Sequence, residues 1–244
     1  MLGLLRHTRI QVNPETTVSL TDVSVRYGHL VVLSDISVSI QRGERVSISG
    51  ANGAGKTTLL RVLAGVMRPG SGRRVGPRRC AYVPAVVDFS RISAEAWLRG
   101  MPRRARTDPR VMLDALGFDG NLSGPCRALS FGNSRKLLLA EALSSGESLI
   151  VIDELSAGLD RRGLDGLNEV MTNVHSSTGC SFVLADQQSR PIDRTDTAYV
   201  VVRRRLVPSS QSDHASLQLT GPTDHVSKLL AAATEFGFTV RRDL

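Results

Sequence analysis

The sequence GANGAGKTT occupies residues 50–58 and follows the spacing GxxxxGK[ST]. Glycines at positions 50, 53 and 55 allow positive φ angles, so that successive backbone N–H groups can wrap around a phosphate. Lys56 brings a positive charge to the β- and γ-phosphates, and the Thr57 hydroxyl can ligate Mg²⁺. The residues predicted to contact a nucleotide here are Gly50, Asn52, Gly53, Ala54, Gly55, Lys56, Thr57 and Thr58. We predict that the chain binds a nucleoside triphosphate with this loop.

The flanking sequence supports this prediction. Residues 44–49 read as a short strand and residues 57–67 as a helix, whose positive N-terminal end would face the phosphates. A glycine-rich turn between a strand and a helix could arise by chance, but the complete motif in this context argues against that alternative.

Composition limits the class of protein. The chain has 244 residues and a net charge of +8, and only three of its 31 Lys and Arg residues are lysine. The arginines are scattered without interleaved aromatics, so we expect mostly solvated surface and no nucleic-acid partner. Attraction to an anionic membrane face or to a partner subunit remains the alternative. No segment approaches the roughly 18 apolar residues of a membrane helix.

Three isolated cysteines, Cys80, Cys126 and Cys180, indicate reduced thiols in a cytosolic protein. The apolar start of the chain is interrupted by Arg6 and is too short for a signal peptide. We expect residues 1–17 to form a poorly ordered leader.

Hydrophobic patterning predicts an α/β fold. β-Branched runs between residues 18 and 49 indicate antiparallel strands followed by a buried parallel strand. We expect a loop over residues 70–79, a strand over 80–83, and mostly helix over 91–145. Apolar strands are predicted at 149–152 and 180–185. Strands that alternate with helices around a phosphate loop indicate a three-layer domain with a mainly parallel sheet.

The second chemical signal is the pair Asp153-Glu154, which follows the apolar run at 149–152. A carboxylate that leaves a buried parallel strand beside a phosphate loop can hold Mg²⁺, usually through water, and the next carboxylate can polarise an attacking water. Acids also end strands simply because loops are polar. The phosphate loop earlier in the chain favours the catalytic interpretation.

Three further segments extend the pattern. Residues 25–28 read VRYG, residues 129–133 read LSFGN just before an expected helix over 134–143, and residues 156–160 read SAGLD. Together with the phosphate loop and the Asp-Glu pair, they resemble the motifs of the ATP-binding subunit of an ABC transporter. This resemblance covers about residues 18–207, and residues 196–206 look like the final strands of that domain.

The resemblance implies a P-loop NTPase fold of ABC type, with an antiparallel β subdomain and a helical subdomain over about residues 86–145. Residues 208–244 look like a small β-α-β appendage. The resemblance to this family also implies ATP and Mg²⁺ as cofactors. It further implies two partners: a second ATP-binding domain in a homo- or heterodimer, and an integral membrane permease subunit. The protein would then be cytoplasmic and peripheral on the inner face of the cell membrane.

Residue roles follow from the same resemblance. Tyr27 would stack on adenine, although an ordinary strand aromatic is the alternative. Ser130 would contact the γ-phosphate bound by the opposite subunit, at a helix N-terminus that favours anions. Glu154, Lys56 and Ser130 would form the catalytic set, with Thr57 and Asp153 at the metal.

The chain departs from the family pattern at several positions. Ala85 stands where a glutamine normally contacts Mg²⁺ and water, and Asp186 stands at the position of the switch histidine, with Gln187 one step away. An ionised carboxylate cannot donate a hydrogen bond to γ-phosphate. Phe131 and Asn133 also alter the signature sequence. We therefore expect intact ATP binding, slow hydrolysis, and faster turnover if Asp186 is replaced by histidine.

Three functions compete at this point. The chain could be the ATPase of an ABC transporter, or a regulatory or structural subunit that binds ATP but turns over little. It could also be an ABC-type protein that acts on nucleic acid or ribosomes. The short stretch from Lys56 to Leu129 and the single phosphate loop count against the third function.

Overall fold

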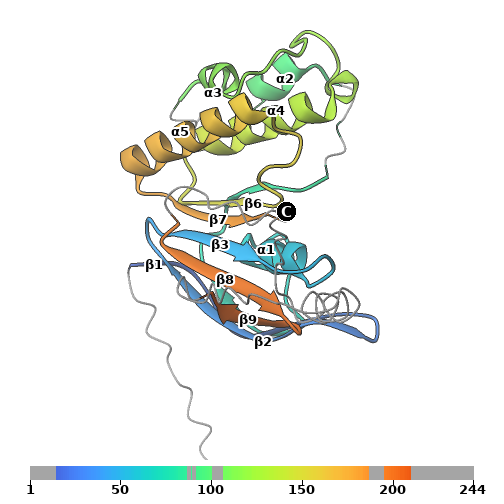
Figure 1. Ribbon diagram of the computed structural model, residues 1–244, viewed down its shortest axis with the longest axis vertical. Helices are drawn as coiled ribbons and strands as arrows, with labels where there is room; N and C mark the ends of the chain where they lie inside the picture. The colour runs from blue at the N-terminus through green and yellow to red at the C-terminus, as the bar shows by residue number, and fades with distance from the viewer. Residues whose placement is uncertain (1–14, 87–88, 90–91, 101–106, 187–194, 210–244) are drawn as a thin grey trace, which may run out of the picture.

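The computed structural model describes residues 15–86, 89, 92–100, 107–186 and 195–209. Two sheets and a set of helices stack in layers, with one helix held between the sheets and the others covering the outer face of the larger sheet (Figure 1). This is the predicted P-loop NTPase fold of ABC type.

The larger sheet has six strands, and its neighbours are parallel except for the last pair. In spatial order the strands are β5 (Ala81–Val83), β6 (Leu149–Ile152), β7 (Ser181–Ala185), β3 (Arg45–Ser49), β8 (Thr197–Val202) and β9 (Arg205–Pro208). The runs at 149–152 and 180–185 are thus confirmed as parallel strands. The last two strands confirm the expectation for residues 196–206.

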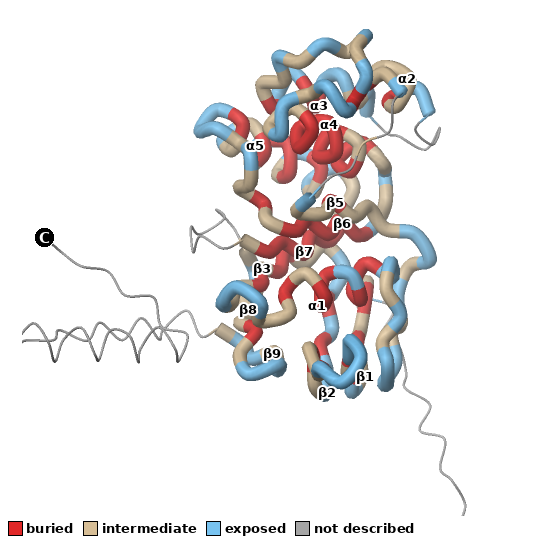
Figure 2. The backbone as a smooth tube through the Cα atoms, turned by 90° about the vertical axis from the view of Figure 1, so that its right-hand side faces the viewer, coloured by how far each residue is buried: buried red, intermediate tan, exposed pale blue. Residues whose placement is uncertain are grey.

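Both faces of the central strands β6 and β7 are buried, which explains their continuous apolar runs. Leu149 and Val151 of β6 point into the core between the two sheets. Ile150 and Ile152 point into the core beneath the outer helices. Figure 2 shows the buried backbone concentrated where these strands lie.

The smaller sheet is antiparallel, in the order β2 (Leu30–Gln41), β1 (Thr16–Tyr27) and β4 (Ser71–Val75). The loop predicted over residues 70–79 is wrong, because Ser71–Val75 pairs with β1. The long strand β1 offers a second edge, and pairing with that edge outweighs the weak strand propensity of Gly and Arg. Gly72 makes this possible, since a Cβ there would lie 2.3 Å from the Asp22 carbonyl oxygen.

The predicted leader over residues 1–17 overlaps the first strand by two residues. Strand β1 begins at Thr16, and the Thr17 hydroxyl lies 2.9 Å from the Ser181 hydroxyl of β7. This contact ties the start of the antiparallel sheet to the larger sheet. Residues 1–14 lie outside the described residues, as do residues 210–244 of the expected appendage.

The helix between the sheets is α1 (Lys56–Leu63), which ends before the predicted residue 67. The outer helical part contains α2 (Ala94–Arg99), α3 (Pro109–Ala115), the short η1 (Cys126–Ala128), α4 (Phe131–Ser144) and α5 (Arg161–Thr178). Helix α4 begins three residues earlier than predicted, because the Ser130 side chain caps it by accepting a hydrogen bond from the Asn133 N–H at 3.2 Å. Within the described ranges, no helix has both the length and the apolar character needed to cross a membrane.

Candidate functional site

Most of the predicted site residues, other than Tyr27 and Ser130, gather at the carboxyl edge of the larger sheet. The phosphate loop follows β3, the pair Asp153-Glu154 follows β6, Asp186 follows β7, and Ala85 comes soon after β5. These strands are parallel and β6, β7 and β3 are adjacent, so their carboxyl ends meet at one edge. Open parallel sheets bind their ligands at this edge.

The phosphate loop has the backbone shape that the sequence predicted. Gly50, Gly53 and Gly55 have φ angles of 143°, 77° and 107°. A Cβ at Gly50 would lie 2.7 Å from the Val201 carbonyl oxygen, so a larger residue cannot replace it without a shift of β8. Gly55 precedes α1 without a side-chain cap, which leaves the first N–H groups of the helix for an anion.

Lys56 lies inside this loop with only 8% of its surface exposed. Its ammonium group donates hydrogen bonds to the carbonyl oxygens of Gly50 at 2.7 Å and Ala51 at 3.0 Å. Burial lowers the pKa of Lys56, and the negative charges of Asp153 and Glu154 act in the opposite direction. The charge is therefore held over the loop and faces both carboxylates.

Asp153 and Thr57 have the chemistry of a magnesium site. Asp153 is 1% exposed, and its Oδ2 atom has no hydrogen-bond partner within the described residues. Burial raises the pKa of Asp153, while a hydrogen bond from the Thr57 side chain lowers it. A buried carboxylate oxygen without a partner needs a cation or water, and hydroxyl and carboxylate oxygens suit Mg²⁺. The residues present fit the ion.

Glu154 is held in an unusual backbone conformation. Its φ angle is 53°, in the left-handed region that residues with a side chain rarely adopt. Strained conformations of this kind persist only where the surrounding structure enforces them, and they cluster at functional sites. The backbone thus sets where the Glu154 carboxylate points.

Part of this enforcement comes from Arg135 of α4, which is fully buried. Its guanidinium donates hydrogen bonds to the carbonyl oxygens of Pro84, Asp153 and Glu154, the last at 2.9 Å. Arg135 was not predicted as a site residue, because one arginine among many scattered ones carries no distinguishing signal. Its position two residues after the LSFGN segment was the only available hint.

Tyr27 lies at the end of β1 and is 46% exposed. Its hydroxyl donates to the Met67 sulfur at 3.7 Å. The pKa of Arg61 of α1 is raised, chiefly by a hydrogen bond with Tyr82 and to a smaller extent by Tyr27. The ring is therefore at the surface near α1. Stacking of Tyr27 on adenine stays a prediction.

Ser130 lies in the outer helical part, on the opposite face of the larger sheet from α1. It caps α4, and the next turn packs against the loop over residues 156–160, since a Cβ at Gly132 would lie 2.7 Å from the Gly158 carbonyl oxygen. The Phe131 ring rests on Gly158 as well and is still 52% exposed. A phosphate contact for Ser130 from an opposite subunit stays a prediction.

The end of β7 makes a contact that the sequence did not suggest. The Ser156 hydroxyl donates a hydrogen bond to Oδ1 of Asp186 at 2.9 Å, and the Leu155 N–H donates to the Ala185 carbonyl oxygen at 2.9 Å. The loop after Glu154 is thus joined to β7 twice. Gln187 lies outside the described residues.

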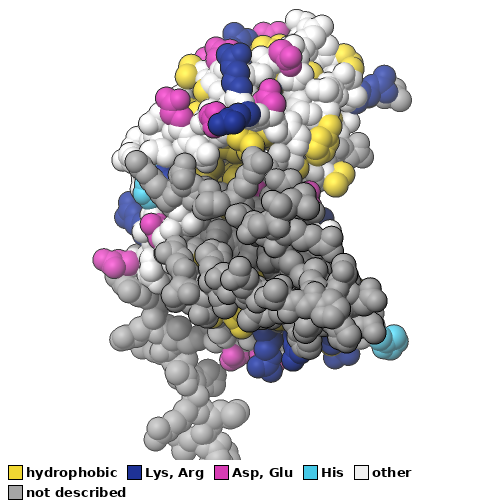
Figure 3. Space-filling model, in the orientation of Figure 1, with side chains coloured by type: hydrophobic (Ala, Val, Ile, Leu, Met, Phe, Trp, Pro, Cys, Tyr) yellow, Lys and Arg dark blue, Asp and Glu magenta, His cyan; other side chains and the backbone are white. Residues whose placement is uncertain are grey.

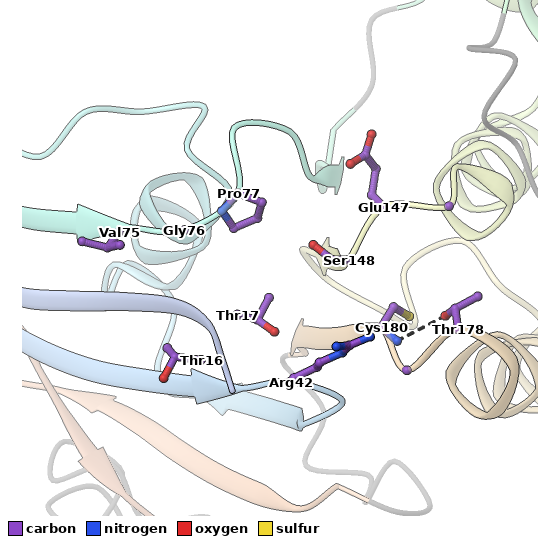
Figure 4. Close-up of a pocket in the computed structure, with 12 residues that line it drawn as sticks. Thr16, Thr17, Arg42, Val75, Gly76, Pro77, Glu147, Ser148, Thr178 and Cys180 are labelled. Carbon is purple, nitrogen blue, oxygen red and sulfur yellow. Dashed lines mark hydrogen bonds between the residues drawn. The ribbon is translucent and has the colours of Figure 1, made fainter. Parts of the chain in front are cut away.

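A cavity lies away from the phosphate loop. It has a volume of about 520 Å³ and is lined by residues that precede strands, including Arg42, Ser148 and Cys180 (Figure 4). These residues mark the amino edge of the sheet, opposite the phosphate loop. This cavity is therefore separate from the proposed nucleotide site.

Charge is mixed on the face of the outer helical part that Figure 3 shows. On the outer helical part, Lys and Arg side chains are interspersed with Asp and Glu (Figure 3). One example is the ion pair between Arg110 and Glu95 at 2.9 Å. Mixed charges of this kind are typical of a solvated surface.

Comparison with known proteins agrees with the geometry. Residues 33–157 match the family model described as ABC transporter. The chain is 29% identical over 211 residues to a zinc import ATP-binding protein of Wigglesworthia glossinidia brevipalpis, covering 83% of this chain and 91% of that protein. A protein of the same name from Alkalilimnicola ehrlichii is 33% identical over 194 residues, covering 75% of this chain and 74% of the relative.

Solved structures show the same fold. An ATP-binding subunit of an ABC transporter superimposes with a TM-score of 0.68 at 24% identity, covering 88% of this chain and 94% of that chain. A dimeric post-hydrolysis state of the ATP-binding cassette MJ0796, bound to ADP and phosphate, also gives 0.68 at 16% identity, covering 78% and 96%. The chain therefore belongs to the ABC transporter family, as an ATP-binding subunit.

Proposed function

We propose that this subunit binds Mg-ATP at the carboxyl edge of the larger sheet, hydrolyses it slowly, and so drives a transporter whose membrane part is a separate permease subunit. Membership of the family makes the chain an ATPase that works with a permease and with a second ATP-binding domain. The proposal adds the site residues, the metal and the rate.

The observation that carries the proposal is the set of Lys56, Thr57 and Asp153 around one loop. Lys56 supplies charge to the β- and γ-phosphates, and the N–H groups at the start of α1 supply hydrogen bonds. Thr57 and the unpartnered oxygen of Asp153 would hold Mg²⁺, which neutralises charge on the phosphates. Glu154, fixed by its backbone, would polarise the attacking water.

The expectation of slow turnover comes from the residues that follow β5 and β7. Ala85 offers no side-chain amide, and Asp186 has no N–H to give to a γ-phosphate. Losing one preorganised contact to a developing charge costs on the order of 10²–10³ in rate. Base, metal ligands and loop charge remain, so turnover is reduced rather than lost.

The cargo is set by the permease. Zinc appears in the names of the relatives, and their assemblies import it. We place this subunit on the cytoplasmic face of the membrane, where ATP is available, and expect it to pair with either a copy of itself or a related domain.

A second candidate function is a regulatory subunit that holds ATP with very little turnover. The residues at 85 and 186 favour it over an ordinary ATPase. Steady-state phosphate release from the full chain, measured with and without its partner permease subunit, distinguishes the two functions. Stimulation by the permease supports the transport ATPase, and ATP binding without release in either condition supports the regulatory subunit.

The direct test of the site is calorimetry with Mg-ATP on the full chain. We expect saturable binding that is lost or strongly weakened in Lys56→Ala. An unmodified chain without affinity for ATP would contradict the proposal.

A further inference from the structure

The hydrogen bond between Ser156 and Asp186 joins two segments that are 30 residues apart in the chain. Asp186 is the first residue after β7, and Ser156 lies two residues after Glu154. A hydroxyl that donates to an ionised carboxylate makes a stronger bond than one between neutral groups. The contact therefore does more than fill space between two loops.

The loop that follows β6 and contains Glu154, Leu155 and Ser156 is held at several points. The Leu155 N–H donates to the Ala185 carbonyl oxygen at 2.9 Å, alongside the side-chain bond. On the opposite side, Arg135 donates to the Glu154 carbonyl oxygen at 2.9 Å. Glu154 lies between these attachments with its φ angle of 53°. Such an angle needs surrounding bonds to maintain it.

The same loop continues to the start of α4. Two residues beyond Ser156, Gly158 packs against Phe131 and Gly132. A displacement of Ser156 would therefore move both the backbone of Glu154 and the surface that faces the cap of α4. Asp186 contacts this loop at its centre.

We propose that Asp186 is a positioning residue for hydrolysis: it holds the loop after β6 through Ser156, and so keeps Glu154 oriented toward the phosphates. This proposal rests on the proposed function, since it assumes that Glu154 acts on bound ATP. It replaces the expectation from sequence that Asp186 only fails to donate a hydrogen bond to γ-phosphate, so that histidine at this position would speed turnover. A histidine at 186 would then lower turnover, because it removes the carboxylate that Ser156 contacts.

The test is a double-mutant cycle on the full chain with Ser156→Ala and Asp186→Ala. Each single change should lower turnover about tenfold, with ATP affinity unchanged by calorimetry. The double variant should be no slower than the slower single variant, because both changes remove one interaction. Ser156→Thr, which keeps the hydroxyl, should lose less than Ser156→Ala.

A matched control exists in the antiparallel sheet. The Ser37 hydroxyl of β2 donates to Oδ1 of Asp22 of β1 at 3.1 Å, and neither residue is among the proposed site residues. Ser37→Ala removes the same kind of bond and should leave turnover unchanged.

Hydrogen exchange supplies a readout that does not depend on the rate of hydrolysis. In both Ser156→Ala and Asp186→Ala, the amide of Leu155 and its neighbours should exchange faster than in the unmodified chain. Additive effects on turnover, unchanged exchange, or faster turnover in Asp186→Ala or Asp186→His would overturn the role of Asp186. Absence of ATP binding in the unmodified chain would instead overturn the proposed function, and the exchange result would still decide whether Asp186 holds the loop.

Discussion

The two sides of the nucleotide site differ in how completely they are equipped. The side built from β3 and β6 carries Lys56, Thr57 and Asp153, which we propose contact phosphate or metal. The side built from the ends of β5 and β7 carries Ala85 and Asp186, which have no N–H in their side chains. If the proposed roles hold, the difference teaches that binding and catalysis can be separated within one site, since one side would fix affinity and the other would limit the rate.

The largest effect is expected at Glu154, where the two sides meet. Glu154→Gln keeps the shape and removes the base, so turnover should fall about 10³-fold while ATP affinity is retained. Phosphate release and calorimetry on the same preparation measure both. Glu147→Gln, at the opposite end of β6, is the matched control and should have no effect. An unchanged rate in Glu154→Gln would mean that Glu154 is not the base.

The next largest effect is expected at Lys56, on the side built from β3 and β6. A control variant distinguishes loss of ATP affinity from loss of the folded state. Lys56→Ala removes the buried ammonium, and ATP affinity should fall about 100-fold or more, because the phosphates lose a desolvated positive partner. Lys136→Ala is the control, since Lys136 is equally buried and donates to the Gly117 carbonyl oxygen at 2.8 Å in the helical part. If both variants lose affinity equally, unfolding rather than the phosphate contact is responsible.

A smaller effect is expected at Ser130, which the structure shows to be a helix cap as well. Ser130→Asp keeps an acceptor for the Asn133 N–H but adds a negative charge at the surface that would face an opposite phosphate. Turnover should fall about tenfold with ATP affinity and melting temperature retained. Ser130→Ala, which removes the cap, should lower the melting temperature instead. Normal turnover in Ser130→Asp would argue against an opposite phosphate.

The smallest effect is expected at Ala85, on the side built from the ends of β5 and β7. Ala85→Gln restores an amide near the metal and water, and turnover should rise about threefold. Ala85→Leu adds similar bulk without hydrogen-bonding capacity and should not raise the rate. An equal rise in both would assign the effect to packing.

The sequence predicted the parts of the site that depend on local spacing. The phosphate loop, the Asp-Glu pair and the helix after the LSFGN segment all consist of neighbouring residues whose backbone conformation follows from their own types. The glycine φ angles at 50, 53 and 55 agree with that expectation. The parallel strands followed in the same way from their apolar runs.

The parts that could not be predicted depend on residues far apart in the chain. Strand β4 forms because β1 has a free edge, which the polar sequence at 71–75 does not reveal. Arg135 reaches three carbonyl oxygens from two other segments, and Asp186 meets Ser156 across 30 residues. Motif spacing placed Asp186 correctly at the end of β7, but only the fold shows what its carboxylate contacts.

The central claim is that this chain holds ATP well and hydrolyses it slowly. The most direct test measures Mg-ATP affinity and steady-state turnover side by side on the unmodified full chain. We predict saturable binding together with turnover well below about 10 s⁻¹, the usual middle of the range for enzymes. Turnover at or above that rate, or absence of ATP binding, would contradict the account.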